Sequence, residues 1–246
     1  MTRNARFTGL SAALTATAVL LTGCADADSG KPGERAGASA SPAGPEPAAV
    51  RLTPEQTAAV LPRADDLLDW SLTTRPAVDD LTKRAALCTG RSAWCKDALH
   101  MSGAFFTHRD AGHIEFTVYA YKTSEAATTA YPLVMEKLEA TELSPKGVTE
   151  VTLPTRVGSA TTARRGTTRL NAPGTLLSAA VGTTVVTVRT GGLATMVKTY
   201  SPKELAALGR LIADRSRQVQ RGGPATAELP KDALTYDALT DEKKKP

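Results

Sequence analysis

Aromatic residues, histidine and cysteine are scarce in this sequence of 246 residues. It contains four Phe, five Tyr, two Trp, three His and three Cys. So few aromatic rings give little support to a carbohydrate-binding surface made of stacked side chains. A zinc site is also poorly supported, because the cysteines form no C-x-x-C pair and supply too few ligands.

The sequence motifs of several enzyme classes are missing as well. There is no G-x-S-x-G turn, and no S-x-x-K with its partner motifs, to carry a nucleophilic serine. The glycine-rich loop and the D-F-G triplet of protein kinases are absent too. We therefore expect a protein that is not an enzyme and that uses no cofactor and no metal ion.

Neither sign of charge dominates the chain, which has 30 Lys and Arg against 25 Asp and Glu. Residues 1–23 contain two of the arginines and no acid, so the rest of the chain has 28 basic and 25 acidic residues, a net charge of +3. This small excess does not favour nucleic acid, and no RNA-binding or zinc-finger signature is found. We expect no nucleic-acid partner.

The N-terminus has the pattern of a bacterial lipoprotein signal peptide. Arg3 and Arg6 precede residues 7–21, an uncharged run shorter than the ~20 residues that a membrane span needs. The run ends in LTGC at residues 21–24, which matches a lipobox, where the cysteine thiol receives diacylglycerol. We predict that Cys24 carries this lipid, with palmitate, and anchors the protein to the extracytoplasmic face of the cell membrane.

The predicted signal peptide covers residues 1–23, and a flexible tether follows over residues 24–50. The tether consists almost entirely of Ala, Gly, Pro, Ser and charged residues, so it buries too little apolar surface to offset its chain entropy. A flexible coil of this length reaches roughly 25–30 Å. We expect one folded domain over residues 51–221 and a flexible tail over residues 222–246.

Cys88 and Cys95 are the two cysteines that lipidation of Cys24 leaves free. An exported chain meets oxidising surroundings, where an even number of cysteines favours pairing. We predict a structural disulfide between them that closes a short loop.

The sequence RDAG at residues 109–112 separates two segments with the pattern of a β-hairpin. A four-residue loop there pairs Phe105 with Phe116 and Thr107 with Ile114. We expect one face of the second strand to belong to the core, formed by Ile114, Phe116, Val118 and Ala120.

A second hairpin is predicted around residues 182–183, a Gly-Thr pair suited to a two-residue turn. This turn pairs Leu177 with Val188 and Ala179 with Val186. Further strands are expected in the sequences GVTEVTL and RVGSATTARR, which lie between the two hairpins.

Four helices are expected. The first begins at Pro54, the second covers residues 78–86, and the third covers residues 124–140. The fourth follows the SPKE capping box at residues 201–204. Pro132 inside the third helix predicts a kink or a late start. The order of hairpins and helices predicts an α+β fold, an antiparallel sheet with helices packed on one face.

Three segments and their order resemble a known family: LPRADDLLDWS, FTVYAYKTSEAATTAY and TTVVTVRTGG, with a cysteine-bearing loop after the first. The pattern is similar to the extracytoplasmic sensor domain of bacterial serine/threonine receptor kinases and of related small lipoproteins, over most of residues 55–220. The resemblance implies a domain that binds an extracellular ligand in a groove and has no catalytic residues. That family domain typically has two disulfides, whereas this chain can form only one.

The candidate ligand-binding residues are two tyrosines on the strand face opposite the hairpin core and the densest basic run of the domain: Tyr119, Tyr121, Arg164, Arg165 and Arg169. Guanidinium groups match phosphate through two hydrogen bonds, so the arginines suit an acidic envelope polymer or a lipid headgroup. The alternatives are tyrosines that line a helix–sheet contact and arginines that are simply solvated.

His108 and His113 flank the turn of the first hairpin, with Asp110 between them. Such a pair could bind a metal ion, but histidines at the tip of a turn are usually solvated, and no second group of ligands is visible. We therefore expect no metal site there.

The sequence as a whole favours a non-enzymatic ligand-binding or sensor-like lipoprotein of the cell envelope, with an unidentified envelope ligand or protein partner. The alternative is a carrier that encloses a lipid or another small apolar ligand. An apolar cavity above ~300 Å³ favours the carrier, and a shallow polar groove favours the sensor.

Overall fold

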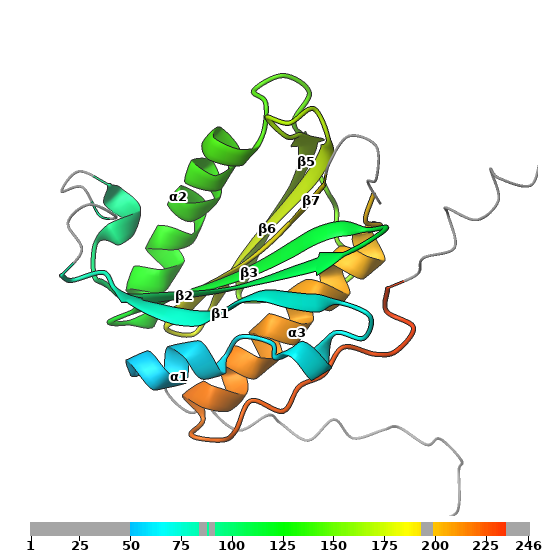
Figure 1. The fold of residues 1–246 in the computed structure, drawn as a ribbon. Helices are drawn as coiled ribbons and strands as arrows, with labels where there is room; N and C mark the ends of the chain where they lie inside the picture. The colour runs from blue at the N-terminus through cyan, green and yellow to red at the C-terminus, as the bar shows by residue number, and fades with distance from the viewer. Residues whose placement is uncertain (1–49, 84–87, 89–91, 193–198, 235–246) are drawn as a thin grey trace, which may run out of the picture. The chain divides into compact units, whose positions relative to one another are not determined.

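The computed structural model (Figure 1) describes four stretches of the chain: residues 50–83, residue 88, residues 92–192 and residues 199–234. The predicted signal peptide, the lipid-bearing Cys24 and the tether up to residue 49 lie outside these stretches, as does the predicted tail from residue 235 on. None of the described helices is long and apolar enough to cross a membrane.

The fold is built on one antiparallel sheet of seven strands, in the order β1-β2-β3-β7-β6-β5-β4. The strands are β1 Ser71–Asp80, β2 Ala98–His108, β3 Gly112–Tyr121, β4 Thr149–Glu150, β5 Ala160–Thr167, β6 Pro173–Val181 and β7 Thr184–Gly191. Together with the helices they confirm the predicted α+β class.

In the described stretches, three α-helices and two short 3-10 helices accompany the sheet. They are α1 Pro54–Ala59, η1 Ala64–Asp66, η2 Ala93–Cys95, α2 Ser124–Glu142 and α3 Pro202–Gln220. The capping box that was predicted for α3 forms, because Ser201 accepts from the backbone of Glu204 and the Glu204 side chain accepts from the backbone of Ser201. Helix α2 begins at Ser124, so Pro132 does not delay its start.

Helices cover both faces of the sheet, which corrects the prediction that they pack on one face. Figure 1 shows α2 on one side and α1 and α3 on the other. The core on the α3 side, which we call the α3-side core, contains Phe106, Phe116, Leu177, Val188 and Leu208. The α2-side core is smaller and includes Tyr119, Tyr121, Trp94 and Val134. Both faces of the central strands are therefore buried.

The hairpin of β2 and β3 forms one residue out of the predicted register. Phe116 pairs with Ala104, and Ile114 pairs with Phe106. The loop has three residues rather than four, because Gly112 adopts a positive φ of 85° and already belongs to β3. The predicted core face of β3 is confirmed, since the four residues expected there are fully buried.

The hairpin of β6 and β7 forms as predicted. Leu177 pairs with Val188, and Ala179 pairs with Val186. Gly182 has a positive φ of 55°, a conformation that glycine adopts without a steric penalty, so the two-residue turn is accommodated.

The helix predicted over residues 78–86 is wrong, because residues 78–80 belong to β1 at the edge of the sheet. Val78 pairs with Ser102, whose hydroxyl donates to the Ala77 carbonyl at 2.9 Å. Pro76 is tolerated in this strand because an edge strand needs only half of its backbone groups for pairing. Residues 84–86 lie outside the described residues.

The described part of the C-terminal segment packs on the domain, which corrects the prediction of a flexible tail from residue 222. Leu234 is 9% exposed and belongs to the α3-side core, and Leu229 packs against that core. Arg215 of α3 fixes this segment through a 3.1 Å hydrogen bond to the Ala227 carbonyl. The same guanidinium pairs with Asp66 at 3.0 Å, and both side chains are almost fully buried.

The predicted disulfide between Cys88 and Cys95 is present. Both cysteines pack against the α2-side core next to Trp94. The bond therefore closes the loop before β2, and η2 at its end packs against α2.

Candidate ligand-binding groove

Both candidate tyrosines are buried, so they do not form the predicted surface. Tyr121 is fully buried and donates its hydroxyl to the Trp94 carbonyl at 2.9 Å. Tyr119 is 4% exposed, and its ring packs edge-on against the Trp94 ring. Burial raises the pKa of both phenols well above the usual range. They line the contact between sheet and helix, the alternative that the sequence left open.

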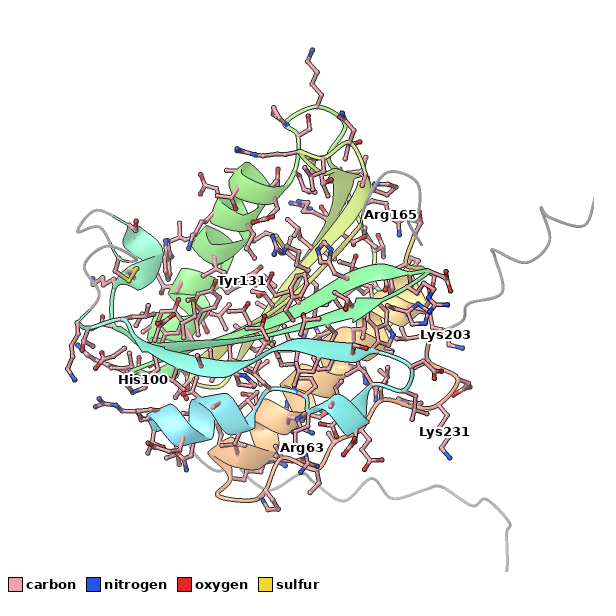
Figure 2. The ribbon with its side chains drawn as sticks, viewed as in Figure 1. Arg63, His100, Tyr131, Arg165, Lys203 and Lys231 are labelled. Carbon is pink, nitrogen blue, oxygen red and sulfur yellow. A yellow bond between two sulfur atoms is a disulfide. The ribbon has the colours of Figure 1, made fainter. Side chains whose placement is uncertain are left out.

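The three candidate arginines do not form one patch. Successive strand residues point to opposite faces, so Arg164 faces α2 whereas Arg165 lies on the α3 side of β5. Arg165, labelled in Figure 2, donates to the carbonyl of Tyr200, a residue of the α3-side core. Arg169 lies in the turn between β5 and β6, on the same side as Arg164. Only Arg164 and Arg169 share a site.

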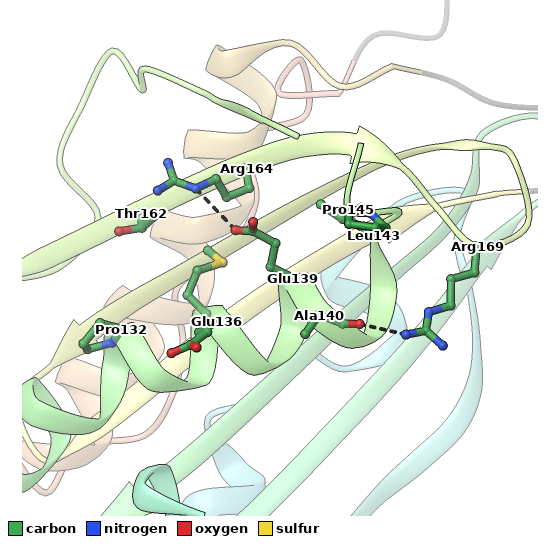
Figure 3. Close-up of a pocket in the computed structure, with 10 residues that line it drawn as sticks. Pro132, Glu136, Glu139, Ala140, Leu143, Pro145, Thr162, Arg164 and Arg169 are labelled. Carbon is green, nitrogen blue, oxygen red and sulfur yellow. Dashed lines mark hydrogen bonds and ion pairs between the residues drawn. The ribbon is translucent and has the colours of Figure 1, made fainter. Parts of the chain in front are cut away.

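That site is a groove of about 580 Å³ between α2 and β5, which we call the α2–β5 groove (Figure 3). The C-terminal half of α2 forms one wall, and β5 and the turn that follows it form the other. The lining residues are Pro132, Met135, Glu136, Glu139, Ala140, Leu143, Pro145, Thr162, Arg164 and Arg169.

The loop after α2 closes one end of the groove. Leu143 forms an isolated β-bridge with Thr168, and the Ser144 backbone donates to the Thr167 carbonyl at 2.7 Å. At the other end, the hydroxyls of Tyr131 and Thr162 lie 3.2 Å apart, and Figure 2 shows Tyr131 between α2 and the sheet. At each end of the groove, α2 or the loop after it therefore contacts β5 or the turn that follows β5 directly.

The two arginines of the groove use only some of their N–H donors in contacts with the protein. Arg164 makes ion pairs with Glu139 at 3.5 Å and with Glu150 at 2.9 Å. Arg169 donates to the carbonyl of Ala140, in the last turn of α2, at 2.8 Å. A guanidinium has five N–H donors, so each of them retains donors for a ligand. Figure 3 shows both interactions of the arginines with α2.

Two glutamates on α2 share the groove with the arginines, and the sequence interpretation missed them. Glu139 pairs with Arg164, whereas Glu136 is exposed and makes no hydrogen bond or ion pair with a described residue. The spacing of three residues, which places both on one side of a helix, is the signal that could have found them. The groove therefore presents two positive and two negative side chains.

Another charged cluster lies on the opposite flank of α2. Arg189 of β7 is paired with Glu115 of β3 and with Glu142, the last residue of α2. His113 lies beside this cluster and stacks on Phe105 with ring centroids 5.0 Å apart. Burial and the charge of Arg189 lower the pKa of His113, and Glu142 opposes them in part. The cluster fixes the end of α2 to the middle of the sheet.

The two histidines of the first hairpin do not face each other. His113 pairs with Thr107, and His108 pairs with Gly112. His108 lies instead against Trp70, with ring centroids 5.3 Å apart. Within the described part of the chain, no group of three or more His, Cys, Asp and Glu residues is arranged to hold a metal ion.

A second groove, of about 560 Å³, runs between α3 and the C-terminal segment, and we call it the α3 groove. Its walls combine small apolar residues with charged ones: Ala206, Ala207, Leu211, Ala227 and Pro230 beside Lys203, Arg210, Asp214, Glu228 and Asp232. None of the five candidate residues lies in it.

Comparisons with known proteins give one similar structure. No protein-family model matches the chain, and no curated protein matches its sequence. The extracellular domain of PknH from Mycobacterium tuberculosis is similar in structure, with 13% sequence identity and a TM-score of 0.46, over 68% of this chain and 98% of that chain. At this level the similarity supports no conclusion about function, and the resemblance drawn from the sequence stays a prediction.

Proposed function

We propose that this protein is a lipid-anchored, non-enzymatic binding module of the cell envelope, and that its α2–β5 groove binds an acidic group of a ligand. The observation that carries the proposal is the meeting of Arg164 and Arg169 in one groove. The two come from different segments, a strand and a turn, so the fold itself brings them together.

The arginines are suited to an exchangeable ligand. Arg164 is 29% exposed, and its partners Glu139 and Glu150 are 39% and 73% exposed. Ion pairs between such exposed groups contribute only ~0–1 kcal/mol to stability, so an incoming acid can replace them at small cost. A guanidinium also accepts carboxylate or phosphate through two parallel hydrogen bonds, which gives the ligand a defined orientation.

The anchor belongs to the proposal through the LTGC sequence at residues 21–24. We expect Cys24→Ala to yield a protein that leaves the detergent phase after phase separation. A variant that still partitions with the membrane fraction like the natural protein contradicts a lipid on Cys24.

The proposed acid site is tested with inorganic phosphate and acetate as probes, titrated against the full chain purified in detergent. We expect the double substitution Arg164→Gln and Arg169→Gln to weaken binding of both probes at least tenfold. Raising the salt concentration should mimic this loss, since exposed charges are screened beyond about 10 Å at 0.1 M salt.

The matched control removes two exposed arginines outside both grooves, Arg109→Gln with Arg156→Gln. It changes the net charge by the same amount and should leave probe binding unchanged. Equal weakening in the control and in the groove variant contradicts the groove as the site, because it shows only a general effect of charge.

A second candidate function is a carrier of a lipid or another small apolar ligand, and the apolar residues in the walls of the α3 groove favour it. A carrier retains an apolar probe at high salt, whereas the acid site does not. We would expect Ala207→Trp to fill the α3 groove and abolish binding of a fluorescent naphthalene probe. If the variant binds the probe as tightly as the natural protein does, the α3 groove does not support a carrier function.

A further inference from the structure

We propose that the ligand of the α2–β5 groove is a zwitterion of the short-peptide class, with its ammonium group at Glu136 and its carboxylate at Arg169. This inference rests on the proposed function and specifies the ligand. Its starting point is the composition of the groove, where Arg164 and Arg169 are balanced by Glu136 and Glu139.

The balance of charge argues against a ligand that is only an anion. A simple anion near the arginines also lies near two carboxylates, which repel it. A ligand that adds a positive group turns one of these repulsions into an attraction. The groove is therefore complementary to a molecule that carries both charges.

The position of the ammonium group follows from the pairing within the groove. Glu139 is already paired with Arg164, so these two charges largely cancel in the middle of the groove. Glu136 makes no ion pair with a described residue, which leaves its carboxylate available. An ammonium is the natural partner, because it donates hydrogen bonds as well as charge.

The carboxylate position follows from Arg169. Its one hydrogen bond to a described residue, from a terminal nitrogen to the Ala140 carbonyl, orients the guanidinium across the end of the groove. The remaining N–H donors suit a carboxylate, which accepts two of them at once. Figure 3 shows Glu136 and Arg169 toward opposite ends of the groove, with Glu139 between them.

The separation of the two positions suits two or three amino acids. Glu136 and Ala140 are four residues apart on α2, a rise of about 6 Å, and Arg169 lies beyond Ala140. An extended peptide spans about 3.3–3.6 Å per residue, so a dipeptide or tripeptide covers roughly 7–10 Å. Met135 and Leu143 also line the groove, but both are almost fully buried, so the charged groups supply most of the surface for a ligand.

The experiment uses tri-alanine, N-acetyl-tri-alanine and tri-alanine amide as probes, titrated by calorimetry against the full chain in detergent. We expect tri-alanine to bind about tenfold more tightly than either blocked peptide, since each block removes one charge. Glu136→Gln should remove the penalty of the acetyl group and keep that of the amide. Arg169→Gln should do the reverse.

The control for the first variant is Glu55→Gln, which removes an exposed carboxylate of α1 and should leave all three affinities unchanged. Equal affinity for tri-alanine and its acetylated form overturns the zwitterion inference. If phosphate still binds in an arginine-dependent way, the proposed acid site stands without it. If neither phosphate nor tri-alanine binds, both proposals fall.

Discussion

The two long helices of this protein have the same length but are held to the sheet in different ways. Twelve of the nineteen residues of α3 are buried, whereas only four of the nineteen residues of α2 are. Helix α3 approaches the sheet so closely that a Cβ on Gly209 would lie 2.8 Å from the Leu177 side chain. Its attachment is mainly apolar packing over a large core.

Helix α2 depends on polar contacts along its second half. Arg164 and Arg169 reach it from one flank, and Arg189 reaches Glu142 from the other. Its buried apolar residues all lie between Ala127 and Met135, so none is found in the last seven residues of the helix. The comparison indicates that the α3 face supplies stability, while the α2 face retains charged groups that a ligand can engage.

The largest effect is expected for Arg215→Ala on the α3 face. The substitution leaves Asp66 charged and buried, and it removes hydrogen bonds to the Val60, Leu61 and Ala227 carbonyls. Breaking one side of a buried ion pair costs about 3–5 kcal/mol. Urea unfolding followed by circular dichroism measures the change, and a loss below ~1 kcal/mol would show that water replaces the guanidinium.

The next effect compares the packing of the two helices directly. Leu208→Ala on α3 removes a fully buried side chain and should destabilise the domain by about 3 kcal/mol. Leu138→Ala on α2 removes a partly buried side chain of the same chemistry and should cost less than half as much. Equal losses in the two variants would contradict the difference between the faces.

Loss of the disulfide tests the α2 face alone. The loop between Cys88 and Cys95 is short, so Cys88→Ser should lower the free energy of unfolding by about 2–3 kcal/mol. A reducing agent should lower the stability of the natural protein by the same amount and have no effect on the variant. If a reducing agent destabilises the natural protein and the variant equally, the disulfide is not the cause of the lost stability.

The smallest effect is a dependence on pH through His113. Its pKa in the folded protein lies below the ordinary value of 6.5, because burial and Arg189 disfavour the charged imidazole. The unfolded chain therefore binds the proton first, and stability falls as the pH drops below about 6.5. His113→Phe should lose less stability than the natural protein between about pH 7.5 and 5.5, as measured by urea unfolding.

Elements with strong local signals were predicted well. The turn at Gly182 and the capping box at Ser201 are determined by residues close together in the sequence, and both form as expected. The first hairpin shifted by one residue because Gly112 can serve either the loop or the strand. The helix predicted at Val78 is wrong because this residue becomes part of a strand only by pairing with Ser102 of β2. The sequence around Val78 does not show that pairing.

The groove was harder to predict than the fold. Tyr119 and Tyr121 lie on the predicted face of β3, but the sequence could not show that α2 covers that face. Arg164 and Arg165 are neighbours in a predicted strand. Successive side chains of a strand point to opposite faces of the sheet, so the strand prediction already implies that these two arginines do not share a site. Glu136 became part of the site only through the tertiary position of α2.

The contact of Val50 fixes the end of the sheet at which the chain enters the domain. Thr183, in the turn between β6 and β7, donates its hydroxyl to the Val50 carbonyl at 2.9 Å. Strand β6 then runs about 30 Å to the opposite end of the sheet, where Arg169 lies. The described chain therefore enters the domain at the end of the sheet remote from Arg169. We expect changes of sequence before Val50 to leave the binding of probes in the α2–β5 groove unchanged.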